Sequence, residues 1–225
     1  MASTRHPETN PQNGRVWLSG GNGAQLEPLV SEFKSLSPFP VWTESLAWNA
    51  NLSSGDNFYA ARVNEGMNLL TQEIQSIVSE CSVVPHIFLA GHSGGADIVT
   101  HTLYNLAGTS TALAIKGAVV YGDPSTNSKQ TYNAKGVTSS TGVFHRTDAQ
   151  TTTINNSYTY FGWSYDNPTI ATPKHYPRVR AYCNKDDWAC RNPIAGLWDA
   201  SAHNAYTSKA EDAYNWMYYL ITDTR

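Results

Sequence analysis

The sequence predicts an α/β fold with a central, mostly parallel sheet of about five strands and helices on both faces. Short apolar segments alternate along the chain with segments of helical periodicity, as in parallel sheets. A chain of 225 residues is long enough for one domain with a sizeable core. The pattern Gly91-x-Ser93-x-Gly95 lies between a strand pattern and a helical one, which indicates a sharp strand-to-helix turn.

The amino-terminal region is expected to contain a flexible arm at residues 1–14, before a single domain at 15–225. Residues 15–19 (RVWLS) have the composition of a strand, and a helix is expected at 24–34. The glycine-rich turn between them, with Gly20 and Gly21, is of a kind that can bind phosphate. It matches neither nucleotide-binding glycine pattern, so a nucleotide site is not favoured.

The middle of the chain supplies the predicted core. Residues 35–48 carry two prolines and two tryptophans and allow at most a short strand. From residue 58 to 80, apolar residues recur at spacings of three and four, which predicts a helix of about twenty residues. A buried strand precedes Ser93, and a helix follows it to about residue 106. A second buried strand is expected at 115–121.

The carboxy-terminal half begins with a polar stretch at residues 127–177. It is too long for an ordinary loop, so it is expected to be functional or partly structured. An alternating segment at 178–183 predicts a strand. A capping-box pattern at 208–211 is expected to open a final helix that ends near residue 221.

Composition excludes several classes of function. The net charge of −3 gives no reason to expect binding to nucleic acid or to an anionic membrane surface. No apolar run is long enough for a transmembrane helix. Only 15% of residues are charged, and polar neutral residues replace them, which favours a secreted, extracellular protein. No signal peptide is visible, so an exported form would have lost its leader.

Two of the three cysteines also favour an extracellular location. Cys183 and Cys190 are close in sequence, and a disulfide between them would stabilise a small loop by roughly 2–3 kcal/mol. Such a pair indicates an oxidising environment. Cys81 has no obvious partner and is expected to be a buried thiol at the edge of the strand before Ser93.

Ser93 is the candidate nucleophile, because the sharp turn would hold its hydroxyl clear of the sheet. A serine hydroxyl needs a base, usually a histidine oriented by a carboxylate. His203 is the preferred base because it lies in a loop just before the last helix. His101, His145 and His175 also follow Ser93, and His92 is expected to pack or to line the pocket.

Three carboxylates are candidates for the orienting acid. Asp187 is preferred, followed by Asp186, because both lie in the loop that Cys183 and Cys190 would close. Asp123 follows a predicted strand at the edge of the sheet where ligands bind, and it is the third choice. The backbone N–H of Gly94 and the Gly20–Gly21 turn are expected to form an oxyanion hole.

These motifs together resemble the cutinase family of small serine esterases. Residues 91–96 (GHSGGA) resemble its nucleophile motif, and residues 121–124 (YGDP) resemble the strand end that follows. Residues 183–190 resemble its disulfide-closed loop, in which the acid falls at Asp187. His203, shortly before the terminal helix, matches the family histidine. The matches extend roughly over residues 81–221.

The resemblance implies a compact α/β-hydrolase without a large lid that cleaves carboxylic esters of lipids, polyesters or acylated polysaccharides. It implies no metal and no organic cofactor, and a monomer is expected. Alternatives are an acetylxylan esterase, a mycolyl-ester esterase like those of phage lysins, an acyltransferase, or a hydrolase-fold binding protein without catalysis. The chain has Gly94 where the family often has glutamine, and it lacks the amino-terminal cysteine that commonly pairs near position 81.

Overall fold

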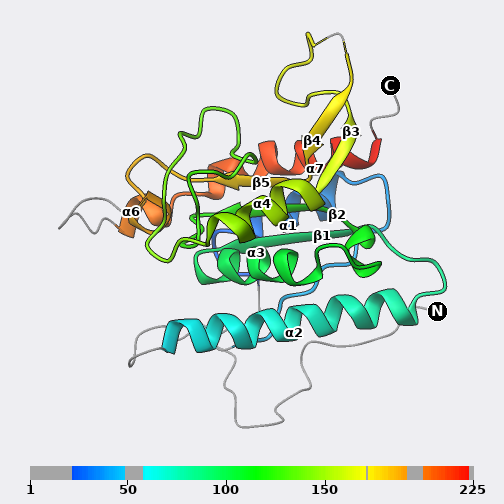
Figure 1. The fold of residues 1–225 in the computed structure, drawn as a ribbon. Helices are drawn as coiled ribbons and strands as arrows, with labels where there is room; N and C mark the ends of the chain where they lie inside the picture. Colours follow the sequence, from blue (N-terminus) through cyan, green and yellow to red (C-terminus); the bar gives the residue numbers. More distant parts are fainter. Residues whose placement is uncertain (1–21, 49–57, 171, 192–199, 223–225) are drawn as a thin grey trace.

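The computed structural model describes residues 22–48, 58–170, 172–191 and 200–222 of the chain (Figure 1). The expected arm at 1–14, the expected strand at 15–19 and the turn with Gly20 and Gly21 lie outside these residues. The expected division into arm and single domain therefore stays a prediction.

A parallel sheet in the order β1-β2-β5 forms the centre of the molecule. Its strands are β1 (Ile87–His92), β2 (Ile115–Tyr121) and β5 (Val179–Tyr182). The predicted parallel α/β architecture is confirmed. Among the described residues the main sheet has three strands rather than about five, and residues 35–48 contain none.

Helices cover both faces of this sheet, as the alternation along β2 shows. Ala118 and Val120 belong to the apolar cluster under α3 (Gly94–Leu106) and α2 (Phe58–Glu80). Val119 and Tyr121 belong to the cluster under α1 (Glu27–Leu36) and α7 (Ala210–Thr222). Successive side chains of a strand point to opposite faces, so one strand contributes to both halves of the core. Figure 1 shows α2 as an outer layer against α3.

The long stretch at 127–177 is partly structured. It contains α4 (Asp148–Ser157) and an antiparallel hairpin of β3 (Thr159–Gly162) and β4 (Lys174–Pro177), which projects from the body in Figure 1. A capping box at Thr147 and Gln150 begins α4.

A buried arginine holds the segment after β3 against the body. The Arg180 guanidinium donates to both carboxylate oxygens of Asp166, at 2.9 Å each, and to Asp212 on α7 at 3.0 Å.

The remaining elements are short. They are η1 (Thr111–Ala114), α5 (Trp188–Arg191), α6 (Ala200–His203) and the 3₁₀ turn η2 (Thr207–Lys209). This turn lies where the capping box was expected, and α7 begins only after it. The helices predicted at 58–80 and from Gly94 to residue 106 agree with α2 and α3.

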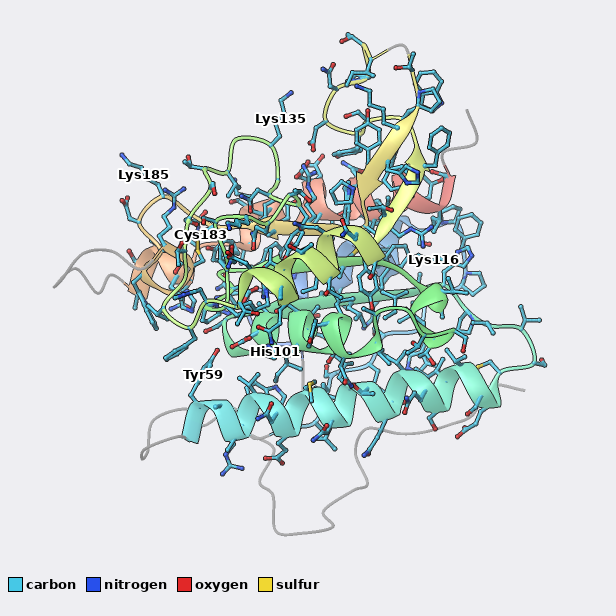
Figure 2. The ribbon with its side chains drawn as sticks, in the orientation of Figure 1. Tyr59, His101, Lys116, Lys135, Cys183 and Lys185 are labelled. Atoms are coloured by element: carbon cyan, nitrogen blue, oxygen red, sulfur yellow. A yellow bond between two sulfur atoms is a disulfide. The ribbon has the colours of Figure 1, made fainter. Side chains whose placement is uncertain are left out.

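Figure 2 shows the direction of the sheet. Cys183, which follows β5, lies at one end, and Lys116 near the start of β2 lies at the other. Because the strands are parallel, the residues after β1, β2 and β5 all lie at the first end. Ligands of open α/β sheets bind at this end.

Candidate active site

Ser93 occupies a strained turn between β1 and α3. Its backbone angles are φ 55° and ψ −126°, and it is the one non-glycine residue with positive φ in the described part of the chain. Such a conformation costs on the order of 1–3 kcal/mol and persists only where the surroundings impose it. The result is a hydroxyl held above the carboxyl end of the sheet, as a nucleophile elbow requires.

The glycines beside Ser93 have different roles. A Cβ on Gly91 would lie 2.3 Å from the carbonyl oxygen of Gly95, so the strand end can approach the helix only without a side chain. A Cβ on Gly95 would meet nothing within 4 Å. The close approach therefore requires glycine at position 91 but not at position 95.

His203 lies next to Ser93 and ends the short helix α6. Its Nε2 is 2.8 Å from the Ser93 Oγ, and its Nδ1 is 2.9 and 3.0 Å from the two carboxylate oxygens of Asp187. An ionised carboxylate only accepts hydrogen bonds, so the proton of a neutral ring lies on Nδ1. Nε2 is then free of its proton and can accept the one from the serine hydroxyl.

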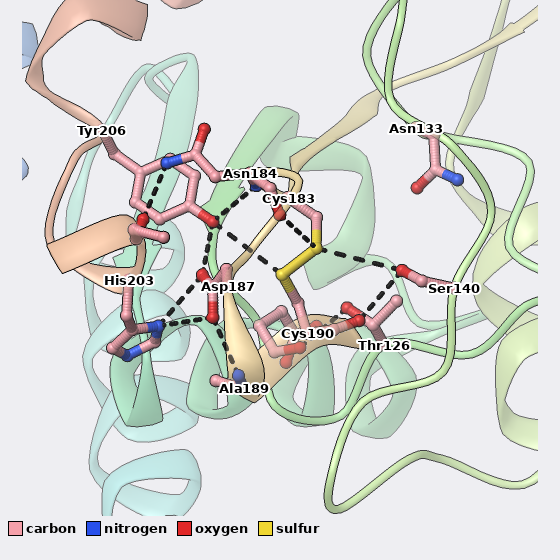
Figure 3. Close-up of a disulfide and its surroundings, with 12 residues drawn as sticks. Thr126, Asn133, Ser140, Cys183, Asn184, Asp187, Ala189, Cys190, His203 and Tyr206 are labelled. Atoms are coloured by element: carbon pink, nitrogen blue, oxygen red, sulfur yellow. Dashed lines mark hydrogen bonds and ion pairs between the residues drawn. A yellow bond between two sulfur atoms is a disulfide. The ribbon is translucent and has the colours of Figure 1, made fainter. Parts of the chain in front are cut away.

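Asp187 is fully buried and directly precedes α5. Its carboxylate accepts from His203, from the Tyr206 hydroxyl at 2.5 Å and from the backbone N–H of Ala189 at 2.8 Å (Figure 3). Burial raises the pKa of Asp187, but the hydrogen bonds from His203 and Tyr206 outweigh burial and lower the pKa below its ordinary value. The acid is therefore ionised at neutral pH despite its burial.

The other candidate acids have other partners or face solvent. Asp123 is buried and forms an ion pair with Arg146, with 2.8 Å between Oδ2 and a guanidinium nitrogen. Asp186 is exposed to solvent. Of the three carboxylates considered, only Asp187 contacts His203 in the described structure.

The other candidate histidines lie elsewhere. His101 is one helical turn from Asp97 on α3, and its Nδ1 is 2.7 Å from that carboxylate. This contact is the main cause of a raised His101 pKa. His145 and His175 are exposed, in a loop and on β4.

A disulfide joins Cys183 and Cys190, as the sequence predicted, and closes the loop that carries Asp187. Ser140 donates to the backbone carbonyl of Cys190 at 2.9 Å, which attaches this loop to the long stretch (Figure 3). Cys81 is a free thiol, but it is exposed, so the expectation of a buried thiol is wrong.

The oxyanion donors are described only in part. Gly94 is the first residue of α3, and the first N–H groups of a helix have no acceptor within it. Gly20 and Gly21 lie outside the described residues. Gln25, four positions after Gly21, accepts from the backbone N–H of Tyr206 at 2.8 Å, so the described part of that segment contacts the loop after His203.

Sequence reasoning missed the role of two side chains. Tyr206 was not singled out, yet its hydroxyl is bonded to Asp187. His92 was expected to pack or to line the pocket, and its ring does pack against His203, with 4.8 Å between centroids. Its Nε2 also lies 2.7 Å from the backbone carbonyl of His203, which no pattern predicted.

The described residues contain neither a metal-binding cluster nor a membrane-spanning helix. No three potential ligands among histidine, cysteine, aspartate and glutamate gather there closely enough to hold a metal ion. In the same ranges, no helix combines the length and apolar character needed to cross a membrane.

A parallel sheet between helix layers, with a strained serine turn at its carboxyl end, is the architecture of the α/β-hydrolases. The Cutinase family model matches residues 22–221, and the chain therefore belongs to the cutinase family. It is an ester-hydrolysing enzyme. No curated protein sequence matches the chain.

Solved structures share the fold. An acetyl xylan esterase has a TM-score of 0.64 at 20% identity, over 91% of this chain and 93% of that one. The catalytic core domain of acetyl xylan esterase from Trichoderma reesei has a TM-score of 0.62 at 19% identity, over 92% of this chain and 95% of that one. A cutinase-like protein from Cryptococcus sp. has a TM-score of 0.61 at 17% identity, over 90% of this chain and 86% of that one.

Proposed function

We propose that the protein is a serine esterase in which Ser93, His203 and Asp187 act as a catalytic triad. The main observation behind this proposal is the 2.8 Å contact between the Ser93 Oγ and the His203 Nε2. The bond from His203 Nδ1 to a buried carboxylate supports it, because that bond selects the tautomer able to accept the serine proton.

The proposed reaction has two stages. His203 removes the Ser93 proton as the hydroxyl attacks the ester carbonyl, and the imidazolium then protonates the departing alcohol. Asp187 stabilises the imidazolium and remains ionised. Water next attacks the acyl-enzyme with His203 again as base, the bond between the acyl carbon and the Ser93 Oγ breaks, and the imidazolium returns the proton to Ser93 as the carboxylic acid leaves.

The backbone N–H of Gly94 is the proposed oxyanion donor within the described residues, and the Gly20–Gly21 turn is the proposed source of a second. Donors of this kind act where negative charge develops on the carbonyl oxygen. The loss of one typically costs about 3 kcal/mol of transition-state stabilisation.

Ser93→Ala tests this proposal. Hydrolysis of a p-nitrophenyl ester should fall to the background rate, while the urea unfolding midpoint should stay close to that of the native protein. Ser110→Ala, at an exposed serine before η1, is the matched control and should keep full activity. Substantial turnover by the Ser93 variant would refute the assignment.

For the substrate we propose a carboxylic ester carried on a polymer or a lipid. The structural neighbours include acetyl xylan esterases and a cutinase-like protein, which supports a comparison of acetylated xylan, a polyester and lipid esters. A mycolyl ester belongs in the same panel. Preferential release of acetate from xylan would identify the acetylxylan esterase alternative, and transfer to added alcohols would identify an acyltransferase.

A binding protein without catalysis is the alternative from another class. A fluorophosphonate reacts covalently only with an activated serine, so failure to label Ser93 would favour that alternative. We further propose a secreted monomer with no nucleic-acid partner, and the disulfide and the low charge support secretion.

A further inference from the structure

His92 immediately precedes the proposed nucleophile, and its side chain contacts the segment that carries the proposed base. Its Nε2 lies 2.7 Å from the backbone carbonyl oxygen of His203, a residue 111 positions away. A carbonyl oxygen can only accept, so Nε2 must carry a proton and donate it. One hydrogen bond therefore joins the turn of Ser93 to the backbone of His203.

The His203 ring is also enclosed by aromatic side chains. Its centroid is 4.8 Å from that of His92 and 5.2 Å from that of Trp188. His92 in turn lies 5.8 Å from the ring of Tyr206. The imidazole of the proposed base is thus in contact with the ring of the residue that anchors its own backbone.

The His203 segment needs such an anchor because it has little regular structure of its own. The helix α6 has four residues, and a helix this short is not stable in isolation. Its position depends on contacts with the body. Besides His92, these include the Asn184 side chain, which donates to the carbonyls of Ala202 and Ala205 at 2.8 and 3.2 Å.

We propose that His92 is a positioning residue for the base: its Nε2–H holds the His203 backbone so that the imidazole stays within hydrogen-bonding distance of Ser93. This inference rests on the proposed function and deepens it. His92 does not touch the reacting atoms, and it acts through the geometry of His203.

The charge state of His92 belongs to the same arrangement. Burial lowers the pKa of His92, and the neighbouring His203 lowers it further. The His203 carbonyl bond and the Asp187 charge oppose this change but do not outweigh it. The ring of Tyr206 also faces the His92 ring. His92 is therefore a neutral donor near pH 7, and its protonation in acid places a second positive charge beside the imidazolium.

The matched test variants are His92→Gln and His92→Met. The two new side chains have similar length and volume, but only glutamine carries an amide N–H near the position of the histidine Nε2. His92→Phe is a second variant that cannot donate, so the result does not depend on one substitution. Urea unfolding establishes that each protein tested is folded.

The readouts are kcat and KM for a small p-nitrophenyl ester and the rate of fluorophosphonate labelling. The Met and Phe variants should lose about fivefold in kcat and in labelling rate, because one hydrogen bond of about 1 kcal/mol no longer fixes the base. KM should change less than about twofold, because the substrate is not contacted. The Gln variant should recover most of the loss.

The pH profile of kcat/KM tests whether the titrating ring of His92 contributes more than its packing volume. In the native protein, protonation of His92 in acid adds a positive charge beside the proposed base, so kcat/KM should fall more steeply in acid than in the three variants, which lack this titrating ring.

Several outcomes overturn the inference while leaving the esterase proposal intact. They are a folded Met or Phe variant that is labelled at the native rate, a Gln variant as slow as Met, and an acidic limb that is identical in all proteins. Absence of labelling in the native protein would instead overturn the proposed function itself.

Discussion

Gly122→Ala should disable the proposed triad without changing any of its members. Gly122 follows β2 with φ +57°, and a Cβ there would lie 2.6 Å from the Asp187 Oδ2 and 3.0 Å from two atoms of the His203 ring. Contact distances of about 3.4 Å or more are normal, so the acid and the base must move by several tenths of an ångström. A misplacement on the order of 1 Å costs about 10²-fold in rate. We expect kcat for a p-nitrophenyl ester to fall roughly 30- to 100-fold.

The positive φ alone also destabilises an alanine by about 1 kcal/mol, so this effect needs its own control. Gly108→Ala provides it, because Gly108 has φ +79° and a Cβ there would meet nothing within 4 Å. It follows α3 at the end of the sheet away from Ser93. Gly108→Ala should lose only the backbone contribution to stability in urea, and Gly122→Ala should lose more because its Cβ also meets Asp187 and His203, but only Gly122→Ala should lose activity. A kcat within threefold of the native value for a folded Gly122→Ala would refute the steric reasoning.

Three further substitutions test other parts of the structure. Tyr206→Phe removes the hydroxyl bonded to Asp187 and should lower kcat about tenfold. Urea unfolding checks that the variant is folded, and an unchanged kcat would contradict a role of Tyr206 in holding the acid. Gly66→Ala places a Cβ 2.2 Å from Cδ1 of the buried Ile98 and should destabilise the protein by about 1–2 kcal/mol in urea, whereas an unaltered midpoint would mean that the α2–α3 contact yields easily. Burial raises the pKa of Asp212, but the Tyr182 hydroxyl and the Arg180 charge lower it overall, so its contribution to stability is present above about pH 4 and is lost as the pH falls through the depressed pKa. Asp212→Asn should therefore reduce the acid-dependent fall in Tm between pH 7 and pH 3, and equal falls in both proteins would disprove this contribution.

The sequence predicted the core elements because each had a strong local signal. The helix α2 shows regular apolar spacing over 23 residues, and β1 and β2 are short apolar segments bounded by turn residues. A capping box at Thr147 and Gln150 begins α4 inside the polar stretch, where no helix was expected. The capping-box pattern at 208–211 was expected to open the final helix, but a 3₁₀ turn precedes α7 there. The expected final helix is therefore present as α7, but it begins at Ala210, inside the pattern and after the 3₁₀ turn.

The proposed site was predictable in its three main residues because they lie in local motifs: a glycine-flanked serine, a cystine loop and a loop before the last helix. Its supporting contacts were not. The bonds from Tyr206 to Asp187 and from His92 to His203 join segments that only the fold brings together. A tyrosine hydroxyl or a histidine ring has no periodicity that identifies its partner, so sequence alone leaves such contacts unassigned.

Arg146 shows why the choice among the acids needed the structure. An isolated arginine in a polar stretch is ordinarily a solvated residue, yet Arg146 is 2% exposed and donates to Asp123, Thr100 and Tyr132. A buried charge requires a partner, and removal of one member of such a pair typically costs about 3–5 kcal/mol. Asp123 therefore neutralises the buried charge of Arg146, although it lies at the expected end of β2. His203 instead contacts Asp187, in the loop that the disulfide closes.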